Sequence, residues 1–225
     1  MTPPPPRWQA VLFDLDGTLV DSLRDVTGSL NHTLGTLGRP ARDLAWVRAH
    51  IGRGAAFLLD SALGAEAGAA LGERALDEFV RFYAGHPCTW TRPYPGASET
   101  LAGLSARGVA LAVLSNKPAA IARRVVAPLG LGRHLRHVWG GDSFPRRKPA
   151  PDGILHFLEE LRLTPREACL VGDLAIDLEC AAAAGVWSCF FTGGYGDESA
   201  LATSADFRIH SLPELIELAA APPSL

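Results

Sequence analysis

The spacing of apolar residues in the first third of the chain predicts helices. Over residues 21–38 apolar side chains recur close to the 3.6-residue helical period, and Gly38 followed by Pro40 ends the run. Further helical stretches rich in Ala and Leu follow at residues 42–50, 54–63 and 66–84. No strand-like alternation interrupts these stretches. Because a short apolar run at residues 11–13 precedes them, the pattern predicts a helical subdomain inserted after a first strand.

The rest of the chain alternates between strand and helix patterns. A proline-rich stretch from His86 to Gly96 predicts the linker that returns from the helical block. After it we expect strands at 109–115, 137–140, 168–172, 186–191 and 206–209, and helices at 97–107, 118–129, 151–162, 175–184 and 212–220. The predicted fold class is therefore α/β, a doubly wound parallel-sheet (Rossmann-like) core with an inserted α-helical cap domain. We place a flexible tail at 1–8, the core at 9–20 and 93–225, and the cap at 21–92.

Two carboxylates follow the first predicted strand. Asp14 and Asp16 alternate along an extended segment, so both side chains are expected on one face, next to the turn-forming Gly17. Two like charges held that close need a shared cation or proton. Taken alone, the pair still favours an ordinary polar turn at a strand end, since Asp and Gly are common turn residues.

Further polar residues follow other predicted strands. Ser115, Asn116 and Lys117 end one strand, and Asp173 ends another, with Asp177 four residues later; Lys148 lies in a loop before a predicted helix. Each has an ordinary interpretation as a helix cap, a surface carboxylate or part of a basic turn. Ligands of open α/β sheets, however, bind at the carboxyl ends of the strands. The coincidence of several such strand ends therefore predicts one shared site.

The residue types in this site indicate phosphoryl transfer. Its four carboxylates, from Asp14, Asp16, Asp173 and Asp177, are hard oxygen ligands that favour Mg²⁺. A serine hydroxyl, backbone N–H groups at a helix start and the Lys148 ammonium form a receptor for phosphate oxygens. A carboxylate between a metal and a phosphate receptor is typical of enzymes that form an aspartyl-phosphate.

Composition narrows the class of partner. The 225 residues are 48% hydrophobic and 20% charged, with a net charge of −3, which gives no basic field for nucleic acid. No apolar run is long enough for a membrane span, and the proline-rich start does not resemble a signal peptide. The four cysteines show no metal or disulfide spacing, so we expect a cytoplasmic protein with Cys169 and Cys189 buried as thiols. Of 21 basic residues only Lys117 and Lys148 are lysines, which singles out these two positions.

The sequence resembles the haloacid dehalogenase superfamily of phosphohydrolases. Its four motifs occur in order as Asp14-Leu15-Asp16-Gly17-Thr18, Ser115-Asn116, Lys148-Pro149, and Gly172-Asp173 with Asp177. The helical insert resembles the cap of the phosphoglycolate phosphatase-like branch, as do the strings Ile51-Gly52-Arg53-Gly54 and Gly140-Gly141-Asp142. One departure is Leu174, where many relatives have a small polar residue.

The resemblance implies a role for each motif residue. Asp14 is expected to be the nucleophile and a Mg²⁺ ligand, and Asp16 the general acid and base, with its backbone carbonyl on the metal. Asp173 is expected to bind the metal, with Asp177 as a ligand or an outer partner. The remaining residues, expected to hold phosphate, are Ser115, Asn116 and Lys148.

The cap is expected to select the substrate, a small phosphorylated metabolite. We take 2-phosphoglycolate as the first hypothesis, with Arg53 and Lys117 as candidate specificity residues. A sugar-phosphate, nucleotide or pyrophosphate phosphatase and a phosphomutase of the β-phosphoglucomutase kind remain as alternatives, and a non-catalytic binding module as a more distant one. The presence of Asp16 argues against a dehalogenase, and the lack of lysine in the cap argues against a phosphonate-cleaving enzyme. The chain is expected to act as a monomer or a homodimer.

Overall fold

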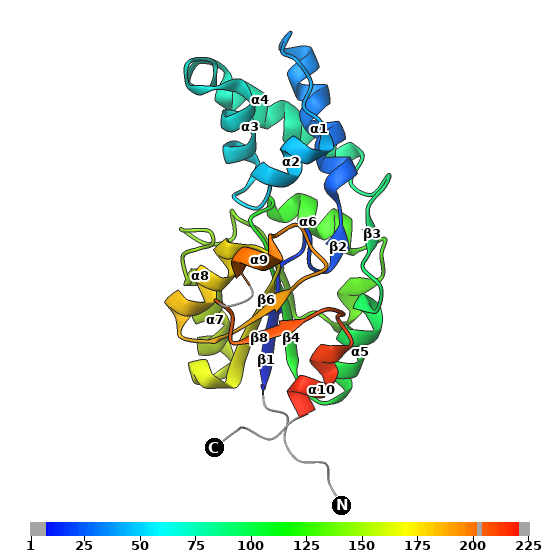
Figure 1. Cartoon of the computed structure of the whole chain (residues 1–225), viewed down its shortest axis with the longest axis vertical. Coiled ribbons are helices and arrows are strands. Elements are labelled where there is room, and N and C mark those ends of the chain that lie inside the picture. The colour runs from blue at the N-terminus through cyan, green and yellow to red at the C-terminus, as the bar shows by residue number, and fades with distance from the viewer. Residues whose placement is uncertain (1–7, 202–203, 221–225) are drawn as a thin grey trace, which may run out of the picture.

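Six parallel strands form the central sheet of the computed structural model, which describes residues 8–201 and 204–220 (Figure 1). In spatial order they are β5 (His137–Trp139), β4 (Ala110–Leu114), β1 (Ala10–Phe13), β6 (Ala168–Gly172), β7 (Trp187–Phe191) and β8 (Phe207–Ile209). All five neighbouring pairs are parallel, and β1 lies between β4 and β6. The predicted doubly wound α/β sheet is thereby confirmed, and the strand that carries Asp14 lies near its centre.

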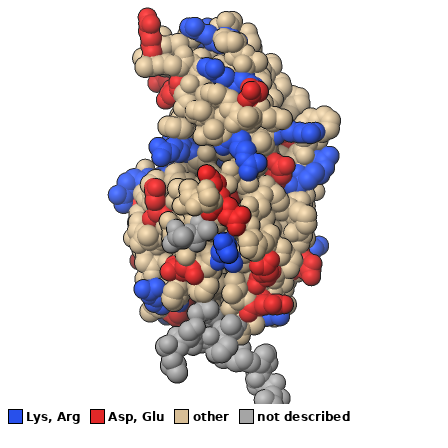
Figure 2. Space-filling view, in the orientation of Figure 1, with Lys and Arg blue, Asp and Glu red and all other residues tan. Residues whose placement is uncertain are grey.

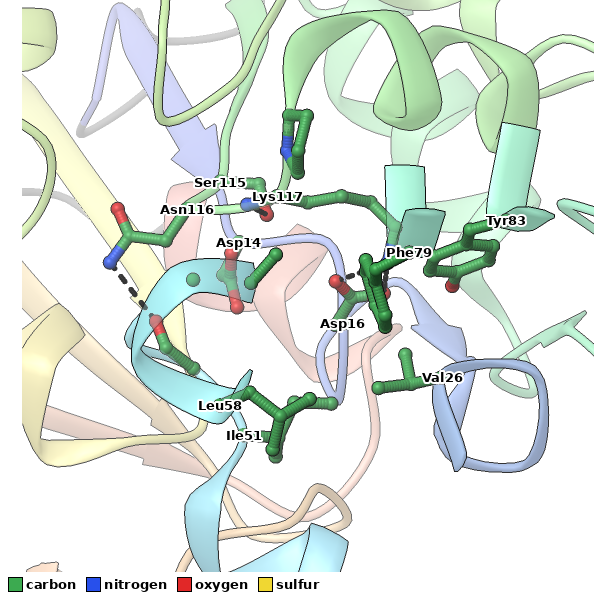
Figure 3. A pocket seen from close by; sticks show the side chains of 14 residues that line it. Asp14, Asp16, Val26, Ile51, Leu58, Phe79, Tyr83, Ser115, Asn116 and Lys117 are labelled. Carbon is green, nitrogen blue, oxygen red and sulfur yellow. Dashed lines mark hydrogen bonds and ion pairs between the residues drawn. The ribbon is translucent and has the colours of Figure 1, made fainter. Parts of the chain in front are cut away.

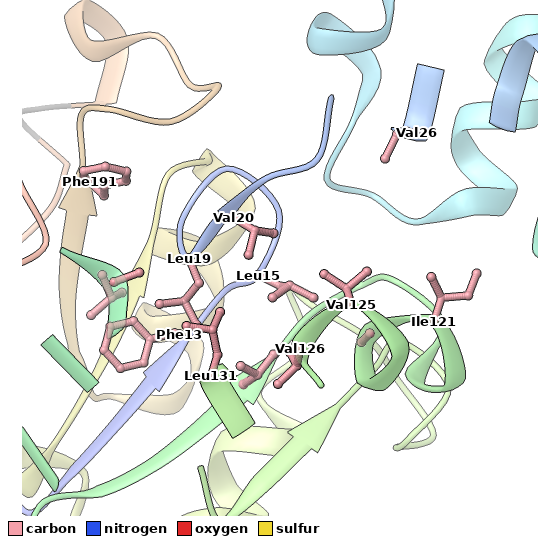
Figure 4. Close-up of a cluster of buried hydrophobic side chains, with 14 of the residues drawn as sticks. Phe13, Leu15, Leu19, Val20, Val26, Ile121, Val125, Val126, Leu131 and Phe191 are labelled. Atoms are coloured by element: carbon pink, nitrogen blue, oxygen red, sulfur yellow. The ribbon is translucent and has the colours of Figure 1, made fainter. Parts of the chain in front are cut away.

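Alternate residues of each strand face two separate apolar layers. Val11 and Phe13 of β1 belong to the larger cluster, together with α5 (Ala97–Ala106), α6 (Ala119–Val126) and α10 (Glu214–Ala220). Figure 4 shows part of this cluster, with Phe13 and Leu19 side by side and Leu15 near Val125 of α6. The intervening residues Ala10 and Leu12 face α7 (Asp152–Leu161) and α8 (Ala175–Ala184). A strand buried on both faces explains the continuous apolar run before Asp14.

Four helices form a second body beyond the carboxyl ends of the strands (Figure 1). These cap helices are α1 (Leu23–Thr36), α2 (Leu44–His50), α3 (Ala55–Leu63) and α4 (Ala65–Gly85). Ala75, Phe79 and Tyr83 recur every four residues along α4 and are buried, as one face of an amphipathic helix should be. The observed bounds of these four helices lie within two residues of the predicted ones, whereas α6 ends three residues before its predicted end at 129; the sheet and helices occur in the predicted order.

A two-stranded ladder carries both chain connections between the cap helices and the sheet. β2 (Val20–Asp21) leads out and β3 (Arg92–Pro93) leads back, and they pair antiparallel with Val20 opposite Pro93. Next to the ladder, the buried carboxylate of Asp25 accepts hydrogen bonds from the backbone N–H of Trp90 and Thr91 and from the Thr91 hydroxyl. The sequence did not predict this ladder, because two-residue strands are too short to show alternation.

Several short elements were also missed, and one expectation was wrong. Helix α9 (Glu198–Leu201) and the 3₁₀ turns η1 (Leu131–His134) and η2 (Pro165–Glu167) were not predicted. Trp8, assigned to the flexible tail, is fully buried and meets the ring of Phe207 edge-on at 5.3 Å. Residues 1–7 of that tail lie outside the described residues. Among the helices that are described, none is long and apolar enough to cross a membrane.

Candidate active site

The turn after β1 brings the first motif against the end of β6. The backbone N–H of Asp14 donates to the carbonyl of Val171 at 2.9 Å, which fixes the start of the turn. Gly17 then adopts a φ of 91°, a left-handed conformation that favours glycine. A Cβ atom at Gly17 would lie 2.2 Å from Oδ2 of Asp173. Glycine at this position therefore permits the close approach of two motifs that lie far apart in the sequence.

Three carboxylates meet where these strand ends converge. Asp14, Asp173 and Asp177 are buried, and each offers an oxygen within 4.8 Å of the others. Asp177 lies in the first turn of α8, where its Oδ2 accepts the N–H of Leu174 at 3.1 Å. A Cβ on Gly172 would lie 2.3 Å from the Cβ of Asp177, so this glycine admits Asp177 beside β6. Asp14 follows one predicted strand and Asp173 and Asp177 follow another, and the structure brings them together.

One ammonium group faces this acid cluster. Nζ of Lys148 lies 2.8 Å from Oδ1 of Asp14 and 2.6 Å from Oδ1 of Asp177. Burial raises the pKa of Asp14 to about 6, with Lys148 opposing the shift and Asp177 adding to it. Burial, together with Asp177 and Asp14, also raises the pKa of Asp173 well above its usual range. Three buried carboxylates with one ammonium leave excess negative charge, which is the electrostatic condition for a cation site.

Asp16 lies in a different environment, although it is only two residues from Asp14. Its two oxygens lie 2.8 and 2.7 Å from Nζ of Lys117, and Oγ of Ser22 also donates to it. The Lys117 ammonium lies 4.5 Å from the centre of the Tyr83 ring. Each of the two lysines of the chain thus neutralises one of the two adjacent aspartates.

Asn116 bridges two loops above the site. Its Nδ2 donates to the carbonyls of Gly52 and Lys148, both at 3.0 Å. Its Oδ1 is buried without a hydrogen-bond partner among the described residues. Both amide hydrogens are therefore used between loops, and the expected phosphate contact of the Asn116 side chain is not set up in this conformation. Ser115, by contrast, is buried beside the site and its Oγ accepts the N–H of Lys117 at 3.3 Å.

The string Gly140-Gly141-Asp142 supports the loop that carries Ser115. A Cβ on Gly140 would lie 2.4 Å from the carbonyl oxygen of Lys117, so the two loops touch backbone to backbone. Oδ1 of Asp142 accepts the N–H of Ala119 at 2.8 Å, which satisfies a donor at the start of α6.

The cap helices supply an apolar wall to the pocket (Figure 3). Asp14, Asp16, Ser115 and Lys117 form its polar side. The facing side chains, which come from the cap helices and the loop before α3, are Val26, Ile51, Leu58, Phe79 and Tyr83. The cavity measures about 40 Å³, which is room for about three water molecules. The sequence did not identify this wall, because Phe79 and Tyr83 at helical spacing are equally typical of an ordinary core.

Two sequence expectations concern the cap loop. Arg53, a candidate specificity residue, is exposed and lies over the ring of Phe57 at 5.3 Å, and it does not line the pocket. Leu174, the departure from the family pattern, packs against Gly52, where a Cβ would lie 2.3 Å from Cδ1 of Leu174. Leu174 therefore forms part of the contact between the core and the cap loop.

Two partners of Asp173 were missed in the sequence. The Thr18 hydroxyl donates to Oδ1 of Asp173 at 2.8 Å, and the backbone N–H of Tyr195 donates to Oδ2 at 2.8 Å. Thr18 belongs to the first motif and was available as a signal. Tyr195 lies in a loop after β7 that carries no pattern of its own.

Known proteins resemble this chain in sequence and in fold. The family model of the haloacid dehalogenase-like hydrolases matches residues 11–191. A phosphoglycolate phosphatase of Chromobacterium violaceum is 37% identical over 214 residues, which cover 93% of this chain and 96% of that protein. The crystal structure of a predicted phosphoglycolate phosphatase from Haemophilus somnus matches with a TM-score of 0.87 and 29% identity, covering 94% of this chain and 98% of that one. The β-phosphoglucomutase of Clostridium difficile shares the fold, with a TM-score of 0.74 and 18% identity over 92% of this chain and 93% of that one. The chain belongs to the haloacid dehalogenase-like hydrolase family, and the resemblance indicated by its four motifs is confirmed.

Proposed function

We propose that the chain is a Mg²⁺-dependent phosphomonoesterase that forms an aspartyl-phosphate on Asp14 and acts on 2-phosphoglycolate. The observation that carries this proposal is that Asp14 and Asp16, two residues apart, each contact a different lysine. Asp14 contacts Lys148 within the acid cluster, whereas Asp16 is held by Lys117 and Ser22. The two carboxylates lie in separate surroundings and can take separate roles, Asp14 in attack and Asp16 in proton transfer once a proton replaces its contact with Lys117. The names of the related phosphoglycolate phosphatases support the choice of substrate.

In the first step an oxygen of Asp14 attacks the phosphorus atom of the monoester. The bond from Asp14 to phosphorus forms while the bond from phosphorus to the leaving oxygen breaks. Asp16 gives a proton to that oxygen, which leaves as an alcohol. Lys148, 2.8 Å from Asp14, is placed to balance the charge of the phosphoryl oxygens together with the Ser115 hydroxyl.

In the second step water releases the phosphoryl group. Asp16 takes a proton from the water molecule, whose oxygen attacks the same phosphorus atom. The bond between phosphorus and Asp14 then breaks, and inorganic phosphate leaves. Asp14 returns to a free carboxylate and Asp16 is again protonated, so the cycle balances.

The acid cluster fits Mg²⁺ as the implied cofactor. Its donors are carboxylate oxygens only, which suit Mg²⁺ better than zinc or copper. We propose that Asp14, Asp173 and the backbone carbonyl of Asp16 hold the ion, which screens the charge between nucleophile and phosphate when bound. Asp177 already engages Lys148 and the N–H of Leu174 with its two oxygens, so it acts mainly by orienting its neighbours.

The pocket supports a small anionic substrate. Lys117 is the cation that lines it beside Asp16, and it is placed to meet a carboxylate on the leaving group. Figure 2 shows basic side chains gathered where the cap helices meet the core, on a molecule whose net charge is −3. The cavity of about 40 Å³ is small for such a substrate, so we expect the cap helices to open before it enters. Arg53 would join the substrate only through that movement.

We also propose that the protein works in the cytoplasm, as a monomer or homodimer, without nucleic acid or a membrane as partner. The negative net charge and the buried thiols of Cys180 and Cys189 support this assignment.

The decisive experiment measures phosphate release by the purified chain with Mg²⁺ and 2-phosphoglycolate. Asp14→Asn, which keeps the shape of the side chain, is expected to abolish release. Asp77→Asn, an exposed change on α4, serves as the matched control and is expected to leave release unchanged. Absence of turnover on a panel of phosphorylated metabolites would overturn the proposal. Conversion of a sugar 1-phosphate to its 6-phosphate without net phosphate release would assign a mutase instead.

A further inference from the structure

The loop that follows β7 is fitted directly against Asp173. The N–H of Tyr195 donates to Oδ2 of Asp173 at 2.8 Å. A Cβ on Gly194 would lie 2.3 Å from the Cβ of Asp173, and a Cβ on Gly196 would lie 1.9 Å from its carbonyl oxygen. The loop and Asp173 are in direct contact, so a shift of the loop changes the surroundings of this carboxylate.

The same loop receives a side chain from the cap helices. Arg48 of α2 donates from Nη2 to the carbonyl of Gly194 at 2.8 Å and from Nε to the carbonyl of Tyr195 at 3.2 Å. Its guanidinium also lies 5.8 Å from the centre of the Tyr195 ring. In Figure 1, α2 is on the side of the cap helices that faces the sheet. Arg48 is itself exposed, so this contact can open without exposing a buried charge.

The Tyr195 side chain extends from this loop to the ladder between β2 and β3. Its hydroxyl donates to Oδ1 of Asp21 at 2.9 Å and accepts the N–H of Ser22 at 2.8 Å. The Ser22 hydroxyl in turn donates to Asp16. One residue thus touches the strand that leads to the cap helices, the partner of Asp16, and Asp173.

We propose that Arg48 is a positioning residue. When the cap helices close, it orients the acid cluster through residues 194–196. When the cap helices close, the two hydrogen bonds from Arg48 fix the carbonyls of Gly194 and Tyr195. This holds the Tyr195 N–H on Asp173, so the acid cluster reaches its final geometry only in the closed state. An open cap then leaves the carboxylate less well oriented, and the site is completed when substrate is enclosed.

The test compares Arg48→Ala, Arg48→Lys and wild type, with Arg74→Ala as a control at an exposed arginine of α4. Hydrogen exchange of the metal-free protein measures the protection of the Tyr195 amide, which donates to Asp173. We expect faster exchange there in Arg48→Ala, an intermediate rate in Arg48→Lys, which retains one donor group, and the wild-type rate in Arg74→Ala. Calorimetric titration with Mg²⁺ should show about three- to tenfold weaker binding in Arg48→Ala.

Steady-state kinetics add a second measurement, the change in kcat relative to KM, which a purely structural role of Arg48 would leave unchanged. Weaker positioning of Asp173 should lower kcat more than it raises KM for 2-phosphoglycolate. Wild-type amide exchange and unchanged Mg²⁺ affinity in Arg48→Ala would overturn the proposal. Its assignment of Asp173 to the metal rests on the proposed function, yet exchange and titration need no substrate. Failure of the proposed function would appear instead as a wild-type protein without turnover.

Discussion

Replacing Asp25 with alanine is expected to lower the free energy of unfolding by about 3–4 kcal/mol. Asp25 is 5% exposed and lies in the first turn of α1. Its carboxylate accepts the N–H groups of Trp90 at 2.9 Å and Thr91 at 2.8 Å, and the Thr91 hydroxyl at 2.7 Å. These bonds tie the first cap helix to the segment that leads back into the core.

The three donors do not contribute equally. Thr91 is fully buried, so its N–H gains no water when the carboxylate is removed, and about 2 kcal/mol is lost there. Trp90 is 59% exposed and the Thr91 hydroxyl can rotate, so each of these donors adds about 0.5–1 kcal/mol. Asp25→Asn keeps the volume and one acceptor oxygen, and is expected to cost about half as much as alanine.

Urea unfolding followed by circular dichroism measures this series. Asp77→Ala, an exposed aspartate on α4, is the control and should match wild type within about 0.5 kcal/mol. The expected order of stability is wild type, Asp25→Asn, then Asp25→Ala. The reasoning is refuted if the free energy of unfolding of Asp25→Ala lies within about 1 kcal/mol of the wild-type value. It is also refuted if Asp25→Asn is less stable than Asp25→Ala, because alanine leaves more buried donors without an acceptor.

Other predictions concern the acid cluster. Mg²⁺ affinity should fall at least about tenfold per pH unit below about 6, because Asp14, with its pKa raised to about 6, then holds a proton that the ion must displace, and the raised pKa of Asp173 acts in the same direction. Titration calorimetry in two buffers of different ionisation enthalpy detects that proton, and a pH-independent affinity contradicts the assignment. Lys148→Met should destabilise the metal-free protein by about 3–5 kcal/mol, because Asp14 and Asp177 lose their shared ammonium. Mg²⁺ should then raise its Tm more than that of wild type, and equal shifts speak against it. Gly172→Ala, which forces a Cβ to 2.3 Å from the Cβ of Asp177, should weaken Mg²⁺ binding about tenfold, whereas Gly28→Ala, which points into open space, should not.

The inner strands β4, β1 and β6 could be predicted from the sequence because they are buried on both faces. Each appears as a short apolar run with a helical pattern on either side, and the motif acids follow the strand ends. A parallel sheet brings those ends to one edge, so the meeting of Asp14 with Asp173 follows from topology. Trp8 was misplaced because a proline-rich segment gives no sign of the ring of Phe207 against which it packs.

The contacts of the cap helices could not be predicted in the same way. Arg48 and Tyr195 are 147 positions apart, and neither lies in a motif. The side chains of Phe79 and Tyr83 have the spacing of any buried helix face, so only the packed structure shows that they border the pocket. Asn116 looks like a phosphate ligand in its motif, yet its amide is turned toward Gly52 and Lys148. These features depend on how the cap helices pack against the core, and the spacing of residues within one helix or motif does not specify that packing.

The ladder of β2 and β3 has a consequence for the modularity of the chain. Because Asp21 lies opposite Arg92, the two points at which the core chain is interrupted are neighbours across one pair of strands. Adjacent strands lie about 5 Å apart, so a tight turn of two residues is long enough to join them. The core chain can thus be closed without the cap helices, and a different insert of any length can be spliced at the same point. If the cap helices select the substrate, as we propose, a new insert would change the substrate preference, and it would also have to supply the contact that Arg48 makes with the loop after β7.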